Sequence, residues 1–253
     1  MQIVAEAGIN HNGSLDTAFK LCDAAKECGA DMVKFQHYHT ASMKRTEMQS
    51  MLKKYEFTGD QFHVLWWHCQ QIGIEYIASV FDLQSLEETE SETIKIGSGE
   101  ITNIELLAAV RKTGKPVILS TGMSTMQEIK IAQTGFHDCT LLHCTSSYPT
   151  ALEDCNMGAM NTLKVFGWTV GFSDHTTGTD SAIMAVALGA TVIEKHFTLD
   201  ETQDGPDHFM SNNPVEFKNY CDSIKEAKIM MGTGDKSVLP CEIETKKIAR
   251  GRW

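Results

Sequence analysis

Short apolar runs alternate with amphipathic stretches of helical length along most of the chain. This alternation is typical of repeated strand–helix units, because parallel strands covered on both faces are rich in Val and Ile. The sequence predicts eight strands, at residues 2–6, 31–36, 75–79, 93–97, 116–120, 139–144, 169–173 and 191–196. Eight such units in roughly 250 residues indicate an α/β protein of the (β/α)₈ TIM-barrel class.

Helix start and stop signals agree with this division of the chain. Ser14 is the predicted N-cap of the first helix, and Thr102 with Glu105 and Thr125 with Glu128 are predicted capping boxes. Glycines suited to left-handed helix ends precede four strands, at Gly29, Gly73, Gly114 and Gly189. The eighth helix is predicted at about 214–231. We therefore expect one barrel domain over residues 1–253, in which 232–253 form a short tail.

Composition narrows the class of partner and compartment. The net charge is −11 and Lys/Arg clusters are few, which argues against nucleic acid or an anionic membrane as partner. The eight cysteines include no C-x-x-C pair, so reduced and mostly buried thiols are expected. The first strand begins at residue 2, and no uncharged apolar run approaches the length of a membrane span. We expect a soluble cytoplasmic protein.

Polar side chains gather where the predicted strands end. They are Glu6, Lys34, Gln36, Ser79, Lys95, Ser98, Glu100, Ser120, Thr121, His143, Thr145, Ser173, His175, Glu194 and His196. The C-terminal ends of all strands in a (β/α)₈ barrel meet at one rim, where active sites are built. The pattern therefore predicts an active site rather than a scatter of surface residues.

Two lysines at this rim point to an anionic ligand. Lys34 and Lys95 end apolar strands, where a buried ammonium is costly unless a negative charge meets it. Each lysine alone could simply pair with a carboxylate, for which the candidates are Glu6, Glu100 and Glu194. Both together, beside the glycine- and hydroxyl-rich segments 97–99 and 120–122, favour a phosphate or carboxylate cradle.

Two histidines at neighbouring strand ends, His175 and His196, suggest a divalent metal site. A single strand-end histidine is more often a hydrogen-bonded core residue, but this pair has Glu6 on the adjoining strand. Further acidic residues stand nearby, namely Asp174, Glu194 and Asp207. Imidazole with oxygen ligands suits Mn²⁺, Fe²⁺, Co²⁺ or Zn²⁺, and such a metal would polarise a carbonyl as a Lewis acid.

Eight ordered segments together resemble the sialic acid synthase (N-acetylneuraminate synthase) family. They are AEAGINHNG (5–13), VKFQ (33–36), KIGSGE (95–100), GKPVILSTGM (114–123), LHCTSSYP (142–149), SDHT (173–176), EKHFT (194–198) and GPD (205–207). The resemblance implies a (β/α)₈ barrel that condenses phosphoenolpyruvate with an N-acylated amino sugar aldehyde, typically N-acetylmannosamine. The product would be a nine-carbon sialic acid, formed with release of phosphate.

The resemblance also implies roles for individual residues. His175 and His196 match the ligands of a divalent metal, usually Mn²⁺ or Mg²⁺, and Glu6 matches a carboxylate that orients or deprotonates water. The phosphoenolpyruvate site would comprise Lys34, Ser79, Lys95, Ser98, Ser120, Ser146 and Ser173. The sugar site would comprise Gln36, Glu100, Tyr148 and Asp207. In the implied reaction, C3 of phosphoenolpyruvate attacks the aldehyde, water adds at C2, and phosphate leaves by C–O cleavage.

Departures from the family pattern leave alternatives for the sugar. Family members usually continue into a small antifreeze-like domain, which contributes to the partner's sugar site in a swapped homodimer, and this sequence stops where the linker would begin. The segment 37–50 is also shorter than usual, and His37 replaces a threonine. The sequence therefore allows a related diamino sugar, giving legionaminic or pseudaminic acid, or a smaller or phosphorylated aldehyde. A phosphorylated sugar would need basic residues, and the candidates are Lys44, Arg45, Lys53 and Lys54. A further alternative is a subunit that depends on a separate C-terminal-domain partner.

Overall fold

Eight parallel strands form a closed barrel in which each strand pairs with its neighbours in sequence and β8 pairs with β1. The computed structural model describes residues 1–251. The strands are β1 (Gln2–Gly8), β2 (Met32–His37), β3 (Glu75–Val80), β4 (Ile94–Ile96), β5 (Val117–Ser120), β6 (Cys139–His143), β7 (Thr169–Asp174) and β8 (Val192–His196). The predicted (β/α)₈ class is confirmed, and every predicted strand end lies within two residues of the observed one.

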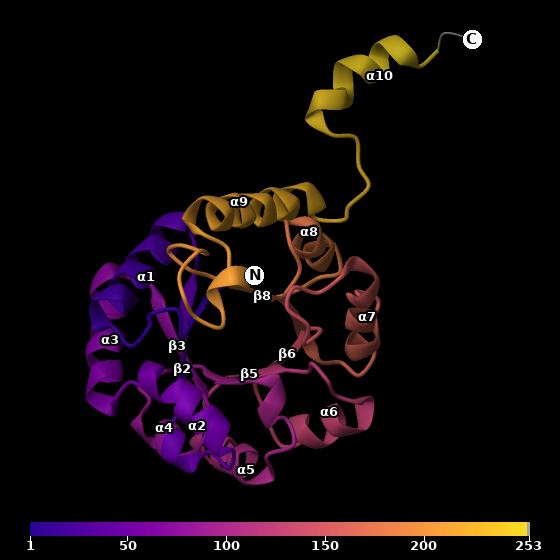
Figure 1. Ribbon diagram of the computed structural model, residues 1–253. Coiled ribbons are helices and arrows are strands. Elements are labelled where there is room, and N and C mark those ends of the chain that lie inside the picture. Colours follow the sequence, from indigo (N-terminus) through magenta and orange to yellow (C-terminus); the bar gives the residue numbers. More distant parts are fainter. Residues whose placement is uncertain (252–253) are drawn as a thin grey trace.

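Helices surround the barrel as a ring (Figure 1). They are α1 (Leu15–Cys28), α2 (Thr46–Leu52), α3 (Gly59–Ile72), α4 (Leu83–Glu88), α5 (Ile104–Thr113), α6 (Met126–Gln133), α7 (Ala159–Lys164), α8 (Asp180–Ala187), α9 (Pro214–Met231) and α10 (Ile243–Ala249). Short 3₁₀ helices are η1 (Thr40–Ser42), η2 (Lys53–Tyr55), η3 (Ser98–Glu100), η4 (Leu152–Asp154), η5 (His208–Met210) and η6 (Pro240–Glu242). Helix α10 stands apart from the ring, within the predicted tail. Residues 252–253 of that tail lie outside the described residues.

Local capping explains where the helices begin. Ser14 caps α1, and Thr125 forms the predicted capping box at α6. The prediction for Thr102 was wrong, because α5 begins at Ile104 and Asn103 is its N-cap, whose side-chain oxygen accepts from the Leu106 N–H (3.2 Å). Asn is as effective an N-cap as Ser or Thr, so Asn103 rather than the neighbouring Thr102 caps the helix. Left-handed backbone is confirmed at all four predicted glycines, Gly29, Gly73, Gly114 and Gly189.

The barrel interior is layered, with an apolar layer below a polar one. Six strands contribute one side chain each to a buried apolar cluster, formed by Val4, Met32, Ile77, Ile118, Leu142 and Val192. Gly171 of β7 has no side chain here, and a Cβ would lie 2.4 Å from the Val192 carbonyl oxygen. Two residues further along the six strands stand Glu6, Lys34, Ser79, Ser120, Cys144 and Glu194. Because strand side chains alternate with a period of two, these residues face the same interior and make the floor of the site.

The opposite faces of the strands pack against the helices in one large apolar core. Asp174 belongs to this outer layer rather than to the rim of the barrel, so its predicted place near the metal was wrong. Its carboxylate pairs with Lys195 (3.3 Å) and accepts a hydrogen bond from the Tyr220 hydroxyl (2.8 Å). The helices within residues 1–251 include none whose length and apolar character would suit a membrane crossing.

Candidate active site

A cavity of about 530 Å³ opens at the C-terminal ends of the strands. All of the predicted site residues except Glu100 line it. They are Glu6, Lys34, Gln36, Ser79, Lys95, Ser98, Ser120, Ser146, Tyr148, Ser173, His175, His196 and Asp207. Glu194, which the rim pattern singled out, lies among them. These side chains come from all eight strands or the turns that follow, so closure of the barrel is what assembles them.

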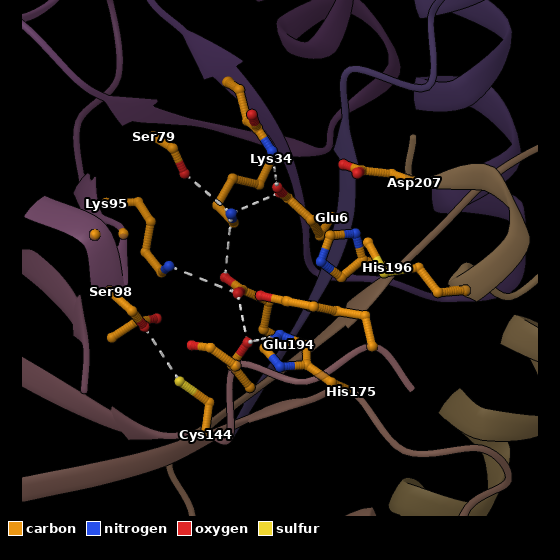
Figure 2. Close-up of a pocket in the computed structure, with 18 of the residues that line it drawn as sticks. Glu6, Lys34, Ser79, Lys95, Ser98, Cys144, His175, Glu194, His196 and Asp207 are labelled. Carbon is orange, nitrogen blue, oxygen red and sulfur yellow. Dashed lines mark hydrogen bonds and ion pairs between the residues drawn. The ribbon is translucent and has the colours of Figure 1, made fainter. Parts of the chain in front are cut away.

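Lys34 is held by charges on both sides. Its ammonium lies 2.6 Å from Glu6 Oε2 and 3.5 Å from Glu194 Oε2, and it donates to the Ser79 hydroxyl (3.0 Å; Figure 2). Strand register explains the first contact, because Glu6 of β1 is aligned with Lys34 of β2. Burial opposes the charge on Lys34, but the two carboxylates outweigh it and raise the pKa of the lysine. The positive charge of Lys34 is therefore already paired within the protein.

Lys95 is buried as deeply but has fewer partners. Among residues 1–251 its ammonium makes one ion pair, to Glu194 Oε1 at 3.6 Å. Burial lowers the pKa of Lys95, and attraction to Glu194 restores it only in part. An ammonium has three donors. Lys95 thus points into the cavity with donors available for an incoming anion (Figure 2).

Glu194 and Glu6 respond differently to the same surroundings. Burial would raise the pKa of Glu194, but Lys34 and Lys95 lower it to about 2, helped by a hydrogen bond from the Ser173 hydroxyl (2.8 Å). Burial raises the pKa of Glu6, since Lys34 offsets only part of that effect and Glu194 adds to it. Glu194 therefore carries a fixed negative charge, while Glu6 is the carboxylate better placed to exchange a proton.

Hydroxyl groups and close backbone approach form one wall. The Gly122 N–H donates to Ser98 Oγ (3.0 Å), and Ser98 Oγ also lies 3.4 Å from Cys144 Sγ. A Cβ on Gly122 would lie 2.3 Å from Ser146 Oγ and 2.9 Å from Ser98 Oγ. Glycine is therefore required for these two hydroxyls to converge beside Lys95.

His175 and His196 lie next to each other in the cavity, with ring centroids 5.7 Å apart. The His175 Nδ1–H donates to the Thr145 carbonyl oxygen (2.7 Å), which leaves Nε2 as the lone-pair nitrogen. Nδ1 of His196 is buried and has no hydrogen-bond partner in the described chain. Burial lowers the pKa of both imidazoles, and His175 lowers that of His196 further. Two neutral imidazoles beside Glu6 fit a divalent cation.

A second group converges at the mouth beside Gly8, where a bulge interrupts the pairing of β1 with β2. A Cβ on Gly8 would lie 3.2 Å from Glu6 Oε1, 3.3 Å from Gln36 Nε2 and 3.4 Å from Asp207 Oδ2. Burial raises the pKa of Asp207 to about 6, and Glu6 contributes to the rise. The ring of Tyr148 packs on His175, with centroids 4.2 Å apart. These groups suit a polyhydroxyl ligand, since they offer both donors and acceptors.

Four rim residues do not line the main cavity. Thr121, His143 and Thr145 line a neighbouring cavity instead. Glu100 is the last residue of η3, where the chain turns outward. It accepts a hydrogen bond from Asn103 (2.7 Å) and lines an adjoining cavity of about 670 Å³. His143 faces the outer layer, where its ring nitrogen bonds to the Cys155 carbonyl (2.8 Å). The prediction that His143 faces the rim was wrong because it lies one residue out of phase with Leu142, which points inward.

Sequence reasoning missed the largely apolar parts of the lining. They are Phe81, Met123, Cys144, Pro206, Phe209 and Met210. A signal existed for Cys144, which follows Leu142 by two residues just past the end of β6, but the others lie outside the strands, where no strand period applies. These residues exclude water around the charged floor, which strengthens electrostatic contacts there.

The chain resembles known proteins in both sequence and structure. The chain matches the model of the NeuB family over residues 21–236. It is 45% identical over 251 residues to an uncharacterised protein of Methanocaldococcus jannaschii, covering 95% of this chain and 74% of that protein. It is 39% identical over 277 residues to the N,N'-diacetyllegionaminic acid synthase of Legionella pneumophila, covering 98% and 78%. The crystal structure of N-acetylneuraminic acid (sialic acid) synthetase from Leptospira borgpetersenii, in complex with citrate, superposes with a TM-score of 0.92 at 34% identity, covering 99% of this chain and 91% of that one.

Proposed function

The chain belongs to the NeuB family of sialic acid synthase-type enzymes, and from this premise we propose that it condenses phosphoenolpyruvate with N-acetylmannosamine or a close N-acylated relative. The product would be a nine-carbon sialic acid, released together with phosphate. Relatives named as synthases of legionaminic and pseudaminic acids are 39% and 33% identical to this chain, so a diamino sugar is within the proposed substrate class.

The observation that carries the proposal is that the two buried lysines differ in how fully protein carboxylates pair with them. Lys34 is bound by two carboxylates, whereas Lys95 has donors available beside the hydroxyls of Ser98 and Ser146. An anion with both carboxylate and phosphate groups would satisfy these donors, and charge-assisted hydrogen bonds of this kind are the strong ones. We assign phosphoenolpyruvate to this wall.

The opposite side of the cavity would hold the aldehyde and the metal. His175 and His196 supply the imidazole ligands, and Mn²⁺ or Mg²⁺ bound there would polarise the aldehyde carbonyl as a Lewis acid. Gln36, Asp207 and Tyr148 lie on this side and would hydrogen-bond the sugar hydroxyls. The aldehyde carbon would thus be presented to the phosphoenolpyruvate wall.

Residues of the chain itself would supply charge stabilisation, proton transfer and phosphate binding. C3 of phosphoenolpyruvate forms the new C–C bond with the aldehyde carbon, and the C2–C3 and carbonyl π bonds are lost. Positive charge then develops at C2, and the aldehyde oxygen becomes an alkoxide that finally takes up the proton released by the incoming water. The fixed negative charge of Glu194 lies beneath this region and stabilises that cation. Glu6, whose pKa burial raises, accepts the proton of the water that adds at C2. Lys95 and the serines hold the phosphate as its C–O bond to C2 breaks.

Phosphate release from phosphoenolpyruvate tests the proposal. We expect release that requires both N-acetylmannosamine and Mn²⁺, is abolished by a chelator, and is lost in His175→Ala. The matched control is His63→Ala, which removes an exposed imidazole on α3 outside the cavity. Release that is indifferent to the sugar or to His175 would contradict the proposal. Binding of phosphoenolpyruvate and metal without turnover would favour a subunit that needs a partner domain.

A phosphorylated sugar is a second candidate, favoured by the adjoining cavity. Lys44 and Arg45 line that cavity, and Phe81 and Gly99 line both it and the main one. A phosphate on the far end of the sugar could therefore reach the two basic residues. A lower KM for the 6-phosphate than for the free sugar, lost in Arg45→Ala, would favour this candidate.

A further inference from the structure

A second group of metal-ligating side chains lies outside the barrel interior, at the end of β2. His37 ends β2 one residue out of phase with the inward-facing Gln36, and His39 follows in the turn; both contact Glu88 of α4. Their Nε2 atoms lie 3.3 Å and 3.1 Å from the same oxygen, Oε2 of Glu88. In residues 1–251, this is the only group of three or more such side chains whose ligand atoms all lie within 4.8 Å of one another.

We propose that His37, His39 and Glu88 bind a structural Zn²⁺ ion, distinct from the metal of the active site. Zinc takes imidazole nitrogen at about 2.0–2.1 Å and carboxylate oxygen at about 2.0–2.2 Å, usually in tetrahedral geometry. Tetrahedral bonds of that length place neighbouring ligand atoms roughly 3.3 Å apart. The two observed nitrogen–oxygen separations match that spacing.

Hydrogen bonds and packing around the group hold each ligand atom toward the centre. Glu88 accepts from the Gln84 amide through Oε1 (2.7 Å), which leaves Oε2 directed at the histidines. His37 is stacked on Phe62, with ring centroids 3.9 Å apart. Nδ1 of His39 faces Asp82 Oδ1 (3.3 Å), the carboxylate–histidine arrangement that orients many metal ligands.

His39 has a carboxylate oxygen at each ring nitrogen, Asp82 at Nδ1 and Glu88 at Nε2. One ring nitrogen of a neutral imidazole donates its N–H, so a proton or a metal ion must stand between the other nitrogen and its carboxylate. Within the described chain, the ion pairs of Asp82 and Glu88 involve no lysine or arginine. A divalent cation would balance the two carboxylates.

The position indicates what the ion would do. It would join the end of β2 to α4 and fix the start of the segment that carries Lys44 and Arg45. His39 and Asp82 line the cavity of about 670 Å³ that these basic residues share, which gives an ion a route to the site. The ion would stabilise the fold rather than take part in the reaction.

Metal stoichiometry in the His175→Ala background separates this site from the active site. We expect one Zn²⁺ equivalent by calorimetry of chelator-treated protein, and Co²⁺ in its place should give the intense visible bands of a tetrahedral site. Adding His39→Gln should abolish the bound equivalent, the Co²⁺ bands and the rise in melting temperature that Zn²⁺ produces. His63→Gln, which breaks a histidine–carboxylate pair of similar distance on α3, is the matched control.

Glu88→Gln keeps the shape of the side chain and guards against an effect of misfolding. It should weaken Zn²⁺ binding at least tenfold while the circular dichroism spectrum of the protein stays unchanged. The proposal is overturned if the His175→Ala protein binds no Zn²⁺, or if its bound equivalent survives both His39→Gln and Glu88→Gln. Either result leaves the proposed synthase reaction untouched, because that reaction is tested by phosphate release.

Discussion

Replacing each buried lysine by methionine should separate a structural charge from a ligand-binding one. Methionine keeps the length of the side chain and removes the ammonium. Lys34 has Glu6 at 2.6 Å, and removing one partner of a buried pair costs about 3–5 kcal/mol of stability. Lys95 has one ion pair at 3.6 Å and a pKa that burial lowers, so its charged form gains little from the protein groups around it. We expect Lys95→Met to change stability by less than about 1 kcal/mol.

For the affinity of phosphoenolpyruvate, the charge of Lys95 should matter more than that of Lys34. Truncating one partner of a buried charge pair costs about 2–5 kcal/mol of binding, or roughly 30-fold or more in Kd. Lys95→Met should therefore lose at least that factor, although the variant is as stable as the parent protein. Urea unfolding measures the first quantity and calorimetry with phosphoenolpyruvate measures the second.

Lys112→Met, on the exposed end of α5, is the matched control and should alter neither quantity. The reasoning is refuted if Lys95→Met, without ligand, destabilises the protein as much as Lys34→Met does. Lys95 would then be a structural partner of Glu194 rather than a ligand for an anion.

Three further predictions follow from single contacts. The pKa of Asp207 is raised from 3.8 to about 6, so the protonated carboxyl stabilises the fold below pH 3.8 and that stabilisation is lost as pH rises through about 6. Asp207→Asn should therefore be more stable than the parent protein by up to about 3 kcal/mol above pH 7 and equally stable below pH 4. Urea unfolding at the two pH values would measure the difference. Gly122→Ala would place a Cβ 2.3 Å from Ser146 Oγ and should raise KM for phosphoenolpyruvate by at least tenfold with an unchanged KM for the sugar, and equal changes in both would contradict it. Asn103→Ala should cost about 1 kcal/mol through loss of the α5 cap, whereas Thr102→Ala should cost almost nothing, and thermal unfolding of the two distinguishes the assignments.

The sequence predicted the barrel well because one physical period controls it. Alternation with a period of two places Val4 and Glu6, or Met32 and Lys34, on the same interior face, so the floor of the site can be predicted from strand sequences. The same rule would have placed Asp174 outward, since it lies between the inward-facing Ser173 and His175.

Residues on turns could not be placed by any period. Glu100 lies on η3, where the chain leaves the barrel and carries the carboxylate into the neighbouring cavity. Asp207 and Tyr148 reach the main cavity from loops. The position of Asp207 after the eighth strand suggested a site residue, whereas the resemblance to a known family alone singled out Tyr148. Their positions depend on long-range contacts such as the approach of Asp207 to Gly8, which no local sequence signal encodes.

The charges of the site explain why its two halves belong together. With both carboxylates ionised, Glu6 and Glu194 cancel Lys34 and Lys95, so the floor is close to neutral before any ligand arrives. An anion carrying both a carboxylate and a phosphate would then leave the cavity strongly negative, in surroundings where burial magnifies the repulsion. The raised pKa of Glu6 reduces this excess by favouring a proton there, but it does not remove it. A divalent cation at the two histidines would offset the remainder, so the proposed phosphate wall and the proposed metal site support each other electrostatically.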